Sequence, residues 1–125
     1  MSGIKLSGVI ERYHEMLAAA DVPGMLKQFD DNGLVREPIG DREVHRGRNE
    51  LLRFFDRLFA SGGMSLERCS LTDDGASCAL EYNLTAWGSI QLPHQAGIAI
   101  YERSRAGLLA AVRLYDEVER PSVTH

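Results

Sequence analysis

The chain has 125 residues, a formal net charge of -4, 44% hydrophobic residues and 26% charged residues. This length and balance predict one globular domain with a core of its own and exclude a disordered chain. An acidic chain with dispersed basic residues does not favour nucleic-acid binding. Because no apolar run approaches the ~20 residues of a membrane span and no signal peptide is visible, we expect a cytoplasmic protein without a membrane partner.

Apolar residues at helical spacing predict three helices in the first half of the chain. The first covers residues 6–20 and carries one apolar stripe. The second begins at its expected N-cap, Asp21, with Pro23 in the first turn. It is expected to end in the stretch 30–33, where a glycine would reverse the chain. The third covers residues 49–60 and ends before two glycines.

Alternating apolar residues predict strands around and after the third helix. Two short strands are expected before it, at residues 34–36 and 41–46. A four-stranded meander follows, at residues 64–72, 76–87, 90–102 and 108–118. Pro93 predicts a bulge or an edge position in the third of these strands. Helices first and strands later indicate an α+β fold, a cone-shaped, strongly curved sheet wrapped around three helices, whose concave mouth would bind a small ligand.

The two cysteines, Cys69 and Cys78, flank the turn expected at residues 73–75. They could sit on adjacent strands, which leaves a disulfide open. Two free thiols are the favoured interpretation for a cytoplasmic protein.

Two stretches of the sequence are similar to a known superfamily. Residues 9–31 resemble the opening of NTF2-like proteins, and residues 34–40, followed by 46–49 and a phenylalanine-rich helix, resemble the SnoaL-like and ketosteroid-isomerase-like branch. The resemblance covers residues 7–119. It implies a single domain over residues 1–125, a curved sheet around an apolar pocket, and a homodimer. Residues 120–125 are expected to form a frayed tail.

The same resemblance implies catalytic residues. Ketosteroid isomerases of this branch use a helical tyrosine that donates to the oxyanion, an acid that moves the proton, and a second, protonated acid. Tyr13 lines up with the tyrosine, and Glu37 lines up with the proton-moving acid. The second acid is missing, since Gly97 or Ile98 stands at its place. His94 lies nearby in the sequence and is the third catalytic candidate.

Each candidate also has a purely structural interpretation. Glu37 could pair with Arg36 or Arg48 in a loop, and Tyr13 could be a core residue whose hydroxyl is satisfied locally. The residues expected to line the pocket are apolar or aromatic: Phe55, Tyr82, Trp87, Ile98, Ile100 and Tyr115.

The remaining histidines are not expected to take part in the site. His14 lies off the apolar stripe and should face solvent, while His45 and His125 lie in weak or terminal segments. No two histidines have ligand-like spacing and no Cys/His cluster exists, so we expect neither a metal nor another cofactor. No phosphate-binding loop is present either.

The favoured function is a cofactor-free isomerase, cyclase or dehydratase. It would move a proton next to the carbonyl group of an apolar, steroid- or polyketide-like ligand, with Glu37 as base and Tyr13 as hydrogen-bond donor. Two alternatives stay open: a module that binds a hydrophobic ligand without turnover, and a dimeric interaction domain that uses the outer face of the sheet.

Overall fold

The computed structural model describes residues 6–37 and 44–115. The helices are α1 (Leu6–Ala19), α2 (Val22–Leu26) and α3 (Gly47–Leu58), and the 3-10 helix η1 (Phe59–Ser61) follows α3 directly. The strands are β1 (Phe29–Arg36), β2 (Val44–Arg46), β3 (Met64–Asp73), β4 (Ser77–Trp87), β5 (Ile90–Arg103) and β6 (Leu109–Tyr115).

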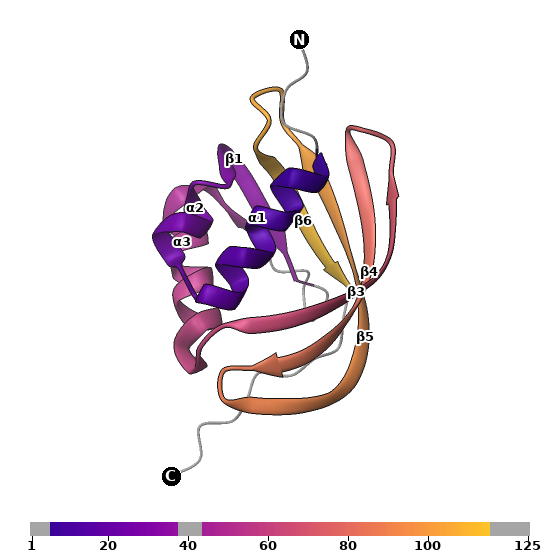
Figure 1. Ribbon diagram of the computed structural model, residues 1–125. Coiled ribbons are helices and arrows are strands. Elements are labelled where there is room, and N and C mark those ends of the chain that lie inside the picture. The colour runs from indigo at the N-terminus through magenta and orange to yellow at the C-terminus, as the bar shows by residue number, and fades with distance from the viewer. Residues whose placement is uncertain (1–5, 38–43, 116–125) are drawn as a thin grey trace.

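The six strands form one mixed sheet in the order β2-β1-β6-β5-β4-β3. Strands β1 and β6 run parallel, and every other neighbouring pair is antiparallel. The sheet curves around the helices, which lie together on its concave side (Figure 1). This arrangement confirms the expected α+β fold.

The core lies between the concave face of the sheet and the helices. On α1 the predicted stripe is buried, and Val9, Ile10, Tyr13 and Leu17 are each less than 5% exposed. On β4 the alternating residues Cys78, Leu80 and Tyr82 belong to the same buried cluster, and Leu84 on the same face is also buried. Each large apolar side chain removed from water contributes about 1.5–3 kcal/mol, so these two patterns position the sheet over the helices.

The start of β1 differs from the prediction. Helix α2 ends at Leu26 and β1 begins at Phe29, so Gly33 lies inside a strand and does not reverse the chain. A Cβ atom at Gly33 would come within 2.9 Å of the Leu109 carbonyl oxygen. Glycine therefore allows β1 to approach β6 closely, at the point where their pairing shifts register between Phe29 and Leu34.

Three local predictions are confirmed. The Asp21 carboxylate accepts a hydrogen bond from the Gly24 amide at 2.9 Å and caps α2. The pairing of β4 with β5 shifts register between Gln91 and Gln95, the stretch that contains Pro93. Cys69 is exposed, Cys78 is buried, and both are free thiols.

Parts of the predicted elements lie outside the described residues, namely 41–43 of the second short strand, 116–118 of the last strand and the tail 120–125. Within the described ranges, none of the helices combines the length and apolar character that a bilayer crossing requires.

Candidate functional site

Glu37 and His45 meet across the β1–β2 hairpin. His45 Nε2 lies 2.8 Å from Glu37 Oε2, within hydrogen-bond distance. The register explains the contact, because Val35 on β1 is opposite His45 on β2. Side chains two residues apart on a strand share a face, so Glu37 is the diagonal neighbour of His45 on the face of the buried Val35. The hairpin therefore brings an acid and an imidazole together on the core side of the sheet.

Packing on α3 holds the imidazole in place. The His45 and Phe54 rings lie 4.7 Å apart between centroids at 32°. Phe54 itself is fully buried. The His45 and Glu37 side chains are only 12% and 23% exposed. A hydrogen bond on one side and a buried ring on the other fix the orientation of His45, as acid–base chemistry requires.

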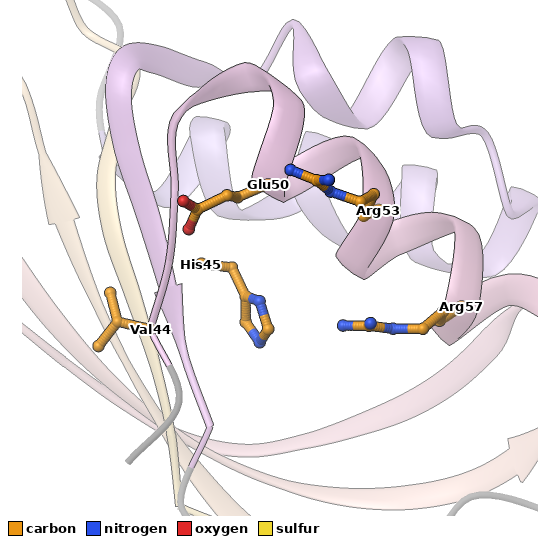
Figure 2. Close-up of a pocket in the computed structure, with 5 residues that line it drawn as sticks. All are labelled: Val44, His45, Glu50, Arg53 and Arg57. Carbon is orange, nitrogen blue, oxygen red and sulfur yellow. The ribbon is translucent and has the colours of Figure 1, made fainter. Parts of the chain in front are cut away.

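A pocket of about 400 Å³ opens beside this pair. It is lined by Val44 and His45 of β2 and by Glu50, Arg53 and Arg57 of α3 (Figure 2). In this view the Arg57 side chain extends toward the His45 ring. The volume lies in the range of small-molecule sites in proteins.

The spacing on α3 places three of its charged residues over the pocket. Glu50, Arg53 and Arg57 follow one another at intervals of three and four residues, which puts them on one face of the helix. A carboxylate oxygen of Glu50 accepts a hydrogen bond from the Arg46 amide at 2.9 Å, at the start of α3. This pocket is thus lined mainly by charged groups, whereas the sequence led us to expect an apolar one.

Tyr13 is not among the residues that line this pocket. It is 2% exposed and its ring packs edge-on against Phe29 and Tyr101. Phe29 in turn packs on Phe55, which packs on Phe54, the neighbour of His45. A series of buried aromatic rings therefore stands between Tyr13 and the Glu37–His45 pair.

The structure corrects the expectation that His14 faces solvent. His14 is partly buried, and its Nε2 lies 3.1 Å from the Tyr101 hydroxyl. Burial, with a smaller effect from the positive charge of Arg68, lowers the pKa of His14 to about 4. Burial also raises the pKa of the Tyr101 hydroxyl well above its usual value. Both groups are therefore neutral at pH 7, and their hydrogen bond tethers α1 to β5.

Three of the predicted pocket residues lie in the core. Phe55 is fully buried in α3, and Tyr82 is 3% exposed on β4. Trp87 is also buried, and its indole N–H donates to the Leu58 carbonyl at 3.1 Å. That bond satisfies a carbonyl at the end of α3, where helices lack partners of their own.

The other three lie on the convex face of the sheet, away from the helices. On β5 Ala99 and Tyr101 are buried, so Ile98 and Ile100, which alternate with them, point the other way. Tyr115 is opposite Ile98 on β6, and the two are 45% and 43% exposed. The expectation that they face inward is corrected by this alternation.

His94 lies on β5 beside the Pro93 bulge, and its side chain is outside the described part of the structure. In the described ranges, no three His, Cys, Asp or Glu residues come together as a metal site would require. The residues that our sequence reasoning missed are His45, Arg53 and Arg57. The three- and four-residue spacing on α3 was the available signal for the arginines.

Known proteins share the sequence family and the fold of this chain. Residues 10–112 match the sequence model of the SnoaL-like domain. Among curated proteins, none matches the sequence. An NTF2-like protein of unknown function from Cytophaga hutchinsonii has a similar structure, with a TM-score of 0.71 at 14% identity over 93% of both chains. A cystatin-like protein of unknown function from Methylobium petroleophilum has a TM-score of 0.72 at 20% identity, over 92% of this chain and 77% of the other.

A third similar structure is SalBIII, an epoxide hydrolase/cyclase-like enzyme in pyran ring formation in the polyether salinomycin. Its TM-score is 0.69 at 18% identity, over 89% of both chains. Identities this low show a shared fold, and function has to be argued from the site.

Proposed function

Since the chain belongs to the family of SnoaL-like domains, we propose that it is an isomerase, cyclase or dehydratase that moves a proton next to a carbonyl group. The observation that carries the proposal is the 2.8 Å contact between Glu37 and His45, with the imidazole on the wall of a pocket of about 400 Å³. A partly buried carboxylate–imidazole pair is an arrangement that proteins use for acid–base chemistry.

We propose different roles for the two residues. His45 lines the pocket, so its imidazole takes the proton from the carbon beside the carbonyl, while the electron pair moves onto the carbonyl oxygen. Glu37 accepts the hydrogen bond from Nε2, orients the ring and stabilises the imidazolium. The enolate then recovers the proton at the same or another atom. Tyr13, which packs in the core, has no role in this proposal.

Hydrogen–deuterium exchange tests the proposal without a known product. Cyclic ketones and enones are incubated in D₂O, and loss of the proton signal beside the carbonyl is followed by NMR. We expect the wild type to accelerate exchange and His45→Gln to lose roughly 10²–10⁴-fold of that rate. Glu37→Gln should lose less, at least about tenfold, because the imidazole remains but is no longer held by a carboxylate.

Glu15→Gln is the matched control, because Glu15 is exposed on α1. The proposal fails if the wild type accelerates exchange in none of the ketones and enones, or if His45→Gln exchanges as fast as the wild type. A larger loss in Glu37→Gln than in His45→Gln would make the carboxylate the base.

A second candidate function, a dimeric interaction module, is favoured by one observation. Ile98 and Tyr115 face each other on the convex side of the sheet and are 43% and 45% exposed. We propose that a second copy of the chain covers them. Light scattering after gel filtration should give a dimer for the wild type and a monomer for Ile98→Glu, with Leu52→Glu as a control of similar exposure on α3. A wild type that runs as a monomer contradicts this candidate.

A further inference from the structure

The pocket beside His45 carries two arginines, Arg53 and Arg57, that form no ion pair with any described residue. Within residues 6–37 and 44–115, neither Arg53 nor Arg57 takes part in an ion pair or a side-chain hydrogen bond. They are four residues apart on α3, so their charges repel each other along the helix. Glu50, the third charged residue of the α3 wall, is engaged by the Arg46 amide.

The sign of this local charge is opposite to that of the whole chain. The α3 wall carries two positive charges and one negative charge, in a chain of net charge -4. An acidic protein repels anions in general, so a cationic wall inside a pocket attracts them to one place. In the view of Figure 2 the Arg57 side chain also extends toward the His45 ring, the group proposed to move the proton.

We infer that Arg53 and Arg57 bind the carboxylate of the substrate, so that the ligand of this pocket is a carbonyl compound that carries a carboxylate. The guanidinium group matches a carboxylate in plane and can donate two parallel hydrogen bonds to it. A single negative charge balances the excess of one positive charge on the α3 wall. A phosphate dianion would leave a surplus negative charge beside Glu50, which disfavours it.

The inference rests on the proposed function for the carbonyl part of the ligand, whereas the anion site can be measured without turnover. The probes are 4-fluorophenylacetate and its neutral amide, 4-fluorophenylacetamide, titrated with the protein and followed by ¹⁹F NMR. Neither titration requires the protein to move a proton. Binding of the carboxylate with no exchange activity in any ketone would overturn the proposed function and leave the anion site standing.

We expect the wild type to bind the carboxylate at least about tenfold more tightly than the amide. Arg53→Gln and Arg57→Gln should each lose about tenfold in carboxylate affinity and leave amide affinity unchanged. Arg48→Gln is the matched control, because Arg48 is exposed on the same helix and does not line the pocket. Added salt should weaken the carboxylate complex only.

Equal affinity for the carboxylate and the amide overturns the inference, and so does unchanged affinity in both arginine variants. Competition distinguishes the kind of anion. Acetate should displace the probe at lower concentration than inorganic phosphate does, and the reverse order contradicts the assignment of a carboxylate.

Discussion

Glu37 and His45 are diagonal neighbours across the β1–β2 hairpin, and their side chains meet at 2.8 Å. Because they touch, we predict that their substitutions are not additive. In a double-mutant cycle of Glu37→Gln and His45→Gln, the free energies of unfolding should couple by about 0.5–3 kcal/mol. In the exchange assay the double variant should be about as slow as His45→Gln alone, since residues that act as a unit lose their effect together.

Urea unfolding of the four proteins measures the coupling in stability. A cycle of Glu15→Gln with His45→Gln is the control and should be additive within about 0.5 kcal/mol, because Glu15 lies on the exposed side of α1. Additive free energies of unfolding for the Glu37 and His45 variants would mean that the contact contributes nothing to stability.

The His14–Tyr101 contact predicts a pH dependence of stability. Folding lowers the pKa of His14 from 6.5 to about 4, mainly through burial. Between these values the unfolded chain binds a proton that the folded chain does not, so stability falls as the pH decreases. The contribution of His14 to the free energy of unfolding is fully present above pH 6.5, and about 3 kcal/mol of it is lost by pH 4.

Urea unfolding at several pH values between 7.5 and 4 tests this dependence. His14→Gln keeps a polar group toward Tyr101 but does not titrate, so the difference between wild type and variant isolates this residue from the carboxylates. The stability advantage of the wild type should shrink steadily as the pH decreases through this range. Parallel profiles would show that His14 does not titrate with folding.

The sequence predicted most of the fold, because the helical stripe of α1 and the alternation of β4 each have only one apolar face. It failed on β5, where residues on both faces are apolar. Ala99 and Tyr101 pack inward, yet Ile98 and Ile100 look equally suited to the core. Alternation alone cannot then identify the buried face. Tyr115 pairs with Ile98 across β5 and β6, so the same error puts both residues on the wrong face.

The site was harder to predict for a different reason. The resemblance to the ketosteroid-isomerase-like branch points to Glu37, whereas the position of its partner His45 depends on the register of β1 against β2. Six residues connect Glu37 to Val44, and a connection of that length is compatible with several registers. Only the pairing of Val35 with His45 places the imidazole beside the carboxylate.

Ala20 offers a prediction on stability at the end of α1. It is the only non-glycine residue with a positive φ in the described part of the chain, at 54°. Glycine adopts this conformation without strain, so Ala20→Gly should stabilise the protein by about 0.5–1 kcal/mol. Ala19→Gly, one residue earlier in the helix, should instead destabilise it by about the same amount. Thermal or urea unfolding checks the signs, and the same sign for both variants refutes the argument.

Alanine substitutions at two glycines with positive φ can distinguish the cost of backbone strain from the cost of a steric clash. Gly75 (φ 92°) lies in the β3–β4 turn, and a Cβ atom there would meet nothing within 4 Å. Gly88 (φ 63°) lies in the β4–β5 turn, where a Cβ atom would collide with the Ser61 carbonyl oxygen of η1. Its amide also donates to the Gly63 carbonyl at 2.7 Å. The β4–β5 turn therefore packs backbone to backbone against the segment that follows α3.

Gly75→Ala should cost about 1 kcal/mol, the strain of a positive φ alone. Gly88→Ala should cost at least about 3 kcal/mol, because the strain is joined by an overlap with backbone that cannot move without shifting η1. Urea unfolding of the two variants gives the difference directly. Equal losses of stability would mean that η1 shifts easily to make room for the added Cβ atom. Helix α3, which carries Arg53 and Arg57 and is followed directly by η1, would then be held less firmly over the pocket than the structure indicates.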